Sequence, residues 1–171
     1  MKKVLTFTLI LIALSTYSQD GNREQISNAI NTMVEGWKAG NGELFASPFT
    51  DDATFKTWFG LEINGKEAIA EGHNFIFKYF YANTVWNLKV DKIRFLTDDF
   101  ALAYCSGAIF KMGATEKTEP DCVPLAVFQR IDEQWKIVSF QNTLYAVGEG
   151  GKSPGDAGVA KQAIWEKVGS R

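Results

Sequence analysis

The amino-acid sequence predicts an α+β fold with a large aromatic core or a lined cavity, and two observations carry the prediction. Segments with helical periodicity come first, whereas segments with strand character and short turns fill the second half. The chain also contains 13 Phe, 5 Trp and 5 Tyr among 171 residues. Because each aromatic ring buries roughly 150–250 Å2 when it lies inside a protein, these residues indicate a large core or a lined cavity.

The first 18 residues have the pattern of a secretory signal peptide. Lys2 and Lys3 precede an apolar run from Val4 to Leu14, and small polar residues follow. That run is shorter than the roughly 20 apolar residues that span a bilayer. We expect cleavage after Ser18, one domain over residues 20–147, and a periplasmic or secreted protein without a membrane partner once the signal is removed.

Composition argues against several partners and cofactors. The formal net charge of −2 becomes more negative when the two leader lysines are removed, and no basic stripe is present. Nucleic acid is therefore not an expected partner. The sequence has no nicotinamide or flavin fingerprint, so no cofactor is expected. A single histidine without matching ligands does not predict a metal site.

The first half of the expected domain contains helices and a small hairpin. Apolar residues at helical spacing predict a first helix over residues 20–39. A short second helix over Glu43–Phe49 should stop near Pro48. Strand-forming residues with an Asn-Gly turn predict a hairpin over 53–63, and helical spacing returns over Lys66–Tyr81.

The second half is expected to be an antiparallel meander. Its strands are predicted at Val85–Phe95, Phe100–Phe110, Val123–Ile131 and Trp135–Ala146, joined by short polar turns. Helices first and strands last is the order of an α+β domain.

Periodicity also predicts which side chains share one face of the domain. His73 is spaced by four, three and four residues within the series Ile69, His73, Ile76 and Phe80, which places it on the buried face of its helix. Strand alternation places Phe55, Thr57, Tyr104, Val127, Phe140 and Asn142 on one face of the sheet. Together with Phe77 from the third helix, these are the expected ligand contacts. Such a wall suits a small hydrophobic or aromatic molecule.

The same alternation predicts which residues share the opposite face of the sheet, which the family resemblance given below implies is convex. Cys105 and Cys122 are expected there on neighbouring antiparallel strands, where a disulfide is geometrically allowed. Ala126, Phe128 and Val138 are expected on that face too.

Several segments carry a resemblance to a known family: FTDDATFKTWFG, EGHNFIF, IRFLTDDFALAY and WKIVSFQNT. Over residues 25–143 the chain resembles the SgcJ/EcaC-type domain of the SnoaL-like families, within the nuclear-transport-factor-2-like (NTF2-like, cystatin-like) superfamily. The resemblance implies a curved antiparallel sheet wrapped around three N-terminal helices, a cone-shaped pocket, and homodimers formed through the opposite sheet face. Members include cyclases, dehydratases and proteins without known activity, so fold alone does not assign chemistry.

One mechanism of the superfamily does not fit this sequence. Ketosteroid isomerase uses an Asp as base and a protonated Asp as oxyanion donor. The matching positions here are Thr57 and a position near Val127. Neither side chain transfers or donates a proton as a carboxylic acid does.

Other polar and aromatic residues have competing interpretations. His73 is either a general acid/base, a hydrogen-bond donor to a ligand, or a core histidine with a satisfied hydrogen bond. Asp51 and Asp52 either share a proton near the cavity or begin a strand, and we favour the strand start. Trp37 is expected in the core.

The C-terminal residues 148–171 read as a Gly-rich linker followed by a short amphipathic helix at Val159–Val168. Gly151-Lys152-Ser153 comes near a phosphate-binding loop. Ala146, however, replaces the first required glycine and Pro154 interrupts the helix start, so nucleotide binding is not expected.

Three functional hypotheses follow from these observations. The leading one is a binder of a small hydrophobic molecule in the cone. The second is a cofactor-free cyclase, dehydratase or isomerase with His73 as its acid/base. The third is a dimeric interaction module whose pocket is filled by its own aromatic rings, and the presence or absence of a lined cavity separates it from the others.

Overall fold

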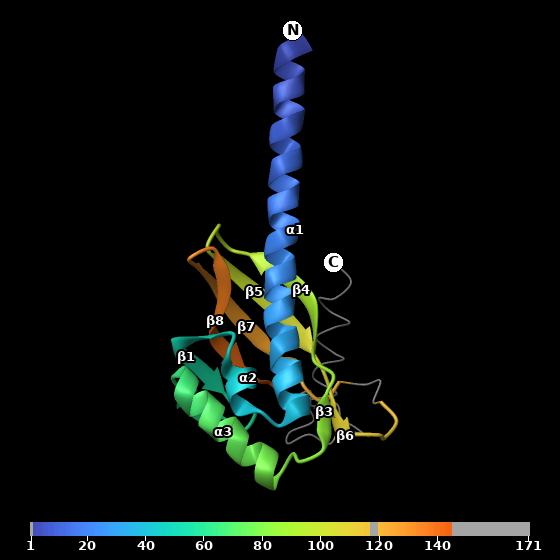
Figure 1. Ribbon diagram of the computed structural model, residues 1–171, viewed down its shortest axis with the longest axis vertical. Helices are drawn as coiled ribbons and strands as arrows, with labels where there is room; N and C mark the ends of the chain where they lie inside the picture. The colour runs from blue at the N-terminus through green and yellow to red at the C-terminus, as the bar shows by residue number, and fades with distance from the viewer. Residues whose placement is uncertain (1, 117–119, 145–171) are drawn as a thin grey trace, which may run out of the picture.

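The computed structural model describes residues 2–116 and 120–144, with side chains from Asp20 onward. The described chain begins with helix α1, Lys2–Ala39, which continues the expected helix toward the N-terminus. Figure 1 shows the lower half of α1 lying across the sheet, while its N-terminal half projects beyond the rest of the domain. None of the helices in the described residues is both long and apolar enough to cross a membrane.

Helix α2, Gly42–Ala46, is a short element held between α1 and helix α3, Lys66–Tyr79. Its first turn is capped by Asn41, whose side-chain oxygen accepts a hydrogen bond from the Leu44 N–H at 2.8 Å. Helix α2 ends earlier than expected because Phe49 already belongs to strand β1, Phe49–Lys56. A tight turn follows β1 and leads to strand β2, Glu62–Asn64.

The described strands form one six-stranded sheet and one two-stranded sheet. The order of the large sheet is β2-β1-β8-β7-β5-β4, with β4 at Lys89–Phe95, β5 at Phe100–Ser106, β7 at Leu125–Ile131 and β8 at Gln134–Gln141. Most neighbours are antiparallel, as expected, but β1 and β8 run parallel. The sheet is therefore mixed, because α3 carries the chain away after the β1–β2 hairpin and the chain re-enters at the far side of the sheet.

Two of the expected long strands are broken in the middle. The segment 84–95 divides into β3, Thr84–Trp86, and β4, while 100–111 divides into β5 and β6, Ile109–Lys111; β3 pairs with β6 in the small sheet. At the break, the Asn87 side chain accepts a hydrogen bond from the Ala108 N–H. Gly107 is required there, since a Cβ at this position would lie 2.8 Å from the Leu88 Cα.

The predicted faces of β5 and β7 are wrong. Ala101, Ala103 and Cys105 on β5, with Ala126 and Phe128 on β7, are buried in the core under the helices. Alternation recognises two faces but does not say which one the helices cover. The helices cover the face of small residues, which permits close packing. The outer face instead carries the cross-strand pairs Leu102–Val127 and Tyr104–Leu125.

Candidate functional site

A continuous cluster of aromatic rings fills the space between the three helices and the inner face of the sheet. Phe45 lies at its centre and contacts six rings, with centroids 3.8 to 6.4 Å away: Trp37, Phe49, Phe55, His73, Phe77 and Trp86. Phe55 stacks on Phe140 at 5.1 Å, and Trp37 joins the cluster from α1. These are the contact distances of packed aromatic pairs.

The burial of these rings shows that they form a core rather than the wall of an open cavity. A side chain that lines a water-sized cavity keeps exposed surface on that side. Trp37 and Phe77 are only 6% and 5% exposed, and Phe140 is fully buried. The cone therefore contains the chain's own rings around Phe45.

Close backbone contacts at two glycines bring Phe45 to the centre of the cluster. A Cβ at Gly36 of α1 would overlap the Phe45 backbone, and a Cβ at Gly42 of α2 would overlap the Ala70 carbonyl oxygen of α3. Both helix contacts thus depend on the missing side chain, because even a methyl group would separate the helices. Phe45 is consequently held directly against α3.

His73 lies on α3 inside the ring cluster and is 4% exposed. Its Nδ1 lies 2.7 Å from the Ile69 carbonyl oxygen, so Nδ1 carries the proton and donates it. The ring stacks on Phe45 and meets Phe55 edge-on. Burial lowers the pKa of His73 to about 4, with the Ile69 carbonyl opposing the shift. The imidazole is therefore neutral at pH 7.

Asn142 comes directly after the end of β8, two residues beyond Phe140. Strand alternation therefore places it on the same face of the sheet as Phe140. Its backbone N–H donates to the Lys56 carbonyl at 2.9 Å. Its Oδ1 is buried and has no hydrogen-bond partner among the described residues. A buried carbonyl oxygen without a donor is unfavourable, so this atom is a candidate contact for a ligand or a water molecule.

The remaining predicted contacts divide into three groups. Phe55, Phe77 and Phe140 lie in the ring cluster, together with His73. Thr57 lies in the β1–β2 turn, where its hydroxyl donates to the Leu61 carbonyl at 3.1 Å. Tyr104 and Val127 are on the outer face of the sheet, so their predicted place in the cavity is wrong.

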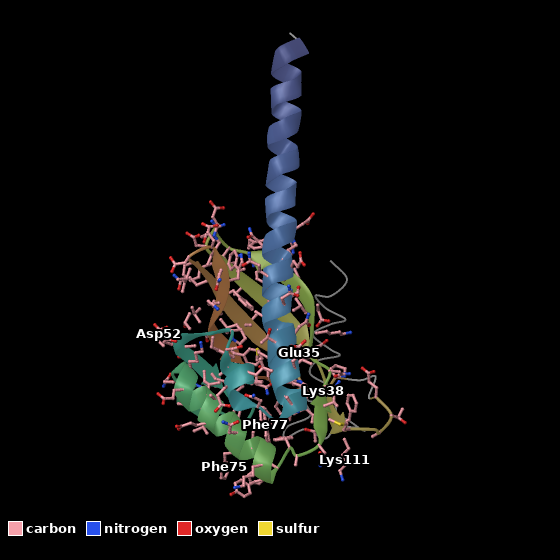
Figure 2. All side chains as sticks on the ribbon, in the orientation of Figure 1. Glu35, Lys38, Asp52, Phe75, Phe77 and Lys111 are labelled. Carbon is pink, nitrogen blue, oxygen red and sulfur yellow. The ribbon has the colours of Figure 1, made fainter. Side chains whose placement is uncertain are left out.

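Several secondary predictions are decided by burial. Asp52 is exposed and does not approach the cone (Figure 2). Trp37 lies in the core, as expected. Phe80, predicted on the buried face of α3, is 69% exposed because the helix ends at Tyr79 and Phe80 is its C-cap.

The two cysteines lie on neighbouring strand segments but in the core, not on the convex face. Cys105 belongs to β5, while Cys122 forms an isolated bridge opposite Gly107. Both thiols are free and buried. Burial raises the pKa of Cys105 to about 12 and also raises that of Cys122, where the nearby Trp86 N–H opposes the shift. The Trp86 Nε1–H is buried and has no nitrogen or oxygen acceptor within hydrogen-bond distance among the described residues.

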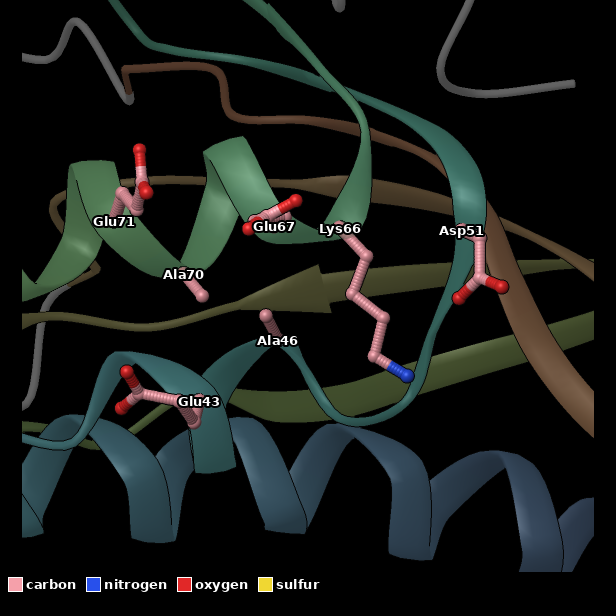
Figure 3. Close-up of a pocket in the computed structure, with 7 residues that line it drawn as sticks. All are labelled: Glu43, Ala46, Asp51, Lys66, Glu67, Ala70 and Glu71. Atoms are coloured by element: carbon pink, nitrogen blue, oxygen red, sulfur yellow. The ribbon is translucent and has the colours of Figure 1, made fainter.

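A groove that the sequence did not predict lies outside the cone, between α2, α3 and the start of β1. It has a volume of about 520 Å3 and is lined by Glu43, Ala46, Asp51, Lys66, Glu67, Ala70 and Glu71. In Figure 3, Lys66 reaches from the start of α3 into the groove. Within the described ranges, no group of three potential ligands is placed to hold a metal ion.

Comparison with solved structures identifies the fold. A domain of unknown function with a cystatin-like fold from Nostoc punctiforme is 26% identical, with 88% of this chain and 87% of that chain covered and a TM-score of 0.70. An NTF2-like protein with this fold from Novosphingobium aromaticivorans is 17% identical, with 80% and 90% covered and a TM-score of 0.63. No family model matches the chain, and no curated protein matches it significantly.

A third solved structure, from Thiobacillus denitrificans, is a putative calcium/calmodulin-dependent protein kinase type II association domain. It is 16% identical, with 68% of this chain and 91% of that chain covered and a TM-score of 0.56. The chain described here thus has a cystatin-like fold. The predicted α+β class and cystatin-like fold are confirmed.

Proposed function

We propose that this protein is a non-enzymatic assembly module that pairs with a second copy through the outer face of its sheet. The observation that carries the proposal is where the apolar surface lies. The chain's own rings fill the cone, whereas an apolar patch remains on the outer face of the sheet. We define the outer patch as Leu102, Tyr104, Leu125 and Val127, which are adjacent across β5 and β7.

The outer patch has the composition of a small interface. Tyr104, which is 38% exposed, supplies an aromatic anchor, and the Lys92 ammonium lies 5.9 Å from its ring centroid at the rim. Apolar centres with polar rims are typical of protein interfaces. The described helices all pack on the other face, so they leave the outer patch available. The Thiobacillus structure with this fold is called an association domain, which agrees with assembly at the level of fold.

Catalysis is not favoured by the environment of His73. A general acid/base works best with a pKa near the operating pH, whereas the pKa of this imidazole is lowered to about 4 by burial. The His73 ring also packs against Phe45 and Phe55, which separate it from polar groups that would orient a substrate.

The oligomeric state of the full chain tests the assembly proposal. Light scattering and sedimentation at micromolar concentration should give a dimer. Val127→Lys should give a monomer, because it places a charge in the centre of the outer patch. Leu96→Lys is the matched control, since Leu96 is exposed in the β4–β5 turn and lies outside the patch. A wild-type monomer, or equal dissociation of both variants, contradicts the proposal.

A small ligand is the second candidate function, and the unpartnered Oδ1 of Asn142 favours it. Such a molecule would be largely apolar and would donate one hydrogen bond to this oxygen, with the ring cluster repacking to admit it. Native mass spectrometry of the protein after incubation with a metabolite extract tests this candidate. A retained molecule that is lost in Asn142→Leu supports it, and retention by neither form opposes it.

We also propose that the chain is exported and belongs to the SgcJ/EcaC-type branch of the fold. The lysine-led apolar segment supports export, and the four motif segments support the branch. Expression with the native N-terminus should yield a periplasmic or secreted protein that starts at Gln19. An intact mass that retains Met1 in the soluble product would oppose export.

A further inference from the structure

The turn between β1 and β2 presents three large apolar side chains to solvent. Trp58, Phe59 and Leu61 are each more than half exposed. The rings of Trp58 and Phe59 lie edge to face, with centroids 5.3 Å apart. We name these three residues the apolar tip. It lies at the end of the sheet where Lys56 of β1 pairs with Gln141 of β8.

Hydrogen bonds hold the apolar tip in one conformation. The Thr57 N–H donates to the Leu61 carbonyl at 2.8 Å, and the Gly60 N–H donates to the Thr57 carbonyl at 3.0 Å. Gly60 has a φ of +92°, a conformation that glycine adopts without strain. The tip is therefore ordered before it meets a partner, so that little conformational entropy is lost on contact.

The charges beside the apolar tip neutralise each other. At its base, the Lys56 ammonium and the Glu62 carboxylate form an ion pair at 3.3 Å. The tip itself contains no charged residue, and the whole chain has a net charge of −2. This arrangement gives no attraction for an anionic surface. The surface that complements the tip is therefore uncharged and apolar.

The size of the apolar tip distinguishes a lipid partner from a protein partner. Large aromatic side chains bury roughly 150–250 Å2 each, so three half-exposed side chains offer on the order of 300 Å2. A stable protein interface buries about 800 Å2 on each partner. The tip alone is too small for such an interface. A lipid layer, in contrast, surrounds each inserted side chain, and Trp is enriched at the boundary between membrane and water.

We propose that the apolar tip inserts into the surface of an uncharged lipid membrane and attaches the folded domain to it reversibly. This departs from the sequence expectation of no membrane partner, which depended on the lack of an apolar segment long enough to span a bilayer. A turn that enters only the membrane surface needs no such segment. The proposal goes beyond the assembly function and does not use the outer patch on β5 and β7.

Quenching of Trp58 fluorescence by brominated lipid tests the proposal. The full chain is mixed with vesicles of brominated phosphatidylcholine, a lipid without net charge, because bromine quenches tryptophans that enter the lipid. Trp37, Trp86 and Trp135 are buried in the core. The wild type should be quenched more than Trp58→Phe. The difference isolates the signal of Trp58, because the other tryptophans are the same in both proteins.

Two further variants separate the tip from the rest of the chain. Phe59→Asp should lower the Trp58 quenching about tenfold or more at limiting lipid, because a carboxylate is costly to bury in a membrane. Leu96→Asp is the matched control, since Leu96 is exposed in the β4–β5 turn at the opposite end of the sheet. It should leave the quenching unchanged. Equal midpoints of urea unfolding confirm that both variants are folded.

Three outcomes overturn the proposal. Equal quenching of wild type and Trp58→Phe would show that Trp58 stays outside the lipid. Quenching that requires anionic lipid, or that salt abolishes, would show that charges and not the apolar tip make the contact. A blue shift of Trp58 emission that grows with protein concentration without vesicles would show that a second copy covers the tip.

Discussion

The imidazole of His73 stacks on the phenyl ring of Phe45, with ring centroids 3.8 Å apart and planes inclined by 21°. This contact joins α3 to α2 inside the cone. It also removes water from the imidazole, which is the main cause of its lowered pKa. The residue that the sequence singles out for proton transfer is therefore a neutral part of the core.

His73 should make folding stability depend on pH between about 6.5 and about 4. Its pKa is about 4 in the folded protein, so over this range the unfolded chain binds a proton that the folded chain does not. The free energy of unfolding therefore decreases as the pH falls from about 6.5 to about 4, by up to about 3 kcal/mol in total. Below pH 4 His73 causes no further loss.

Denaturant unfolding of wild type and His73→Gln at pH 7.5 and pH 4.5 measures this effect. His73 is the only histidine in the sequence, so no other imidazole titrates in this interval. The carboxylates are the same in both proteins, so their contribution cancels in the comparison. The wild type should lose more stability than the variant over this interval. An equal loss in both proteins would show that His73 is solvated in the folded state.

Two glycines of α1 should respond in opposite directions to the same substitution. Gly36→Ala should destabilise the fold by about 1–3 kcal/mol, because the new methyl group overlaps the Phe45 backbone. Gly21→Ala, with nothing within 4 Å of the new Cβ, should stabilise α1 by up to about 1 kcal/mol. Thermal and denaturant unfolding measure both. Equal effects would mean that α1 and α2 do not pack closely at Gly36.

The thiols of Cys105 and Cys122 should be unreactive in the folded protein. The thiolate is the reactive species, and burial raises the pKa of Cys105 to about 12 and also raises that of Cys122. An aromatic disulfide reagent at pH 8 should label neither residue at a measurable rate without denaturant and both residues rapidly in denaturant. Rapid labelling of the native protein would show that the β5 region is open to water.

Asn142→Leu should leave stability unchanged or raise it by about 1 kcal/mol in the absence of a ligand. The substitution removes a buried oxygen that has no donor among the described residues, and it keeps a similar volume. Asn142→Ala is the comparison, because it removes the same oxygen but leaves a cavity. A loss of 2 kcal/mol or more for Asn142→Leu would show that Oδ1 is hydrogen-bonded in the folded protein.

Local sequence signals were sufficient for the class of fold and for most elements. The helical spacing of Ile69 and His73 placed this imidazole in the core, and the burial of both confirms it. A short polar turn was also expected between the last two strands, and the structure has it at Asp132 and Glu133, both with the positive φ angles that a two-residue hairpin requires. These features depend on neighbours a few residues apart, which the sequence shows directly.

Tertiary packing decided what the sequence left open. Whether Tyr104 or Cys105 faced the helices depended on which face α1 covers, and α1 lies against the face carrying alanines. Likewise, the number of aromatic residues did not reveal whether they line a cavity or fill it. That outcome follows from the contacts of Gly36 and Gly42, which bring Phe45 into the centre. Periodicity assigns a residue to one face of its helix or strand. Which other segments pack against that face is determined by contacts between residues far apart in the sequence.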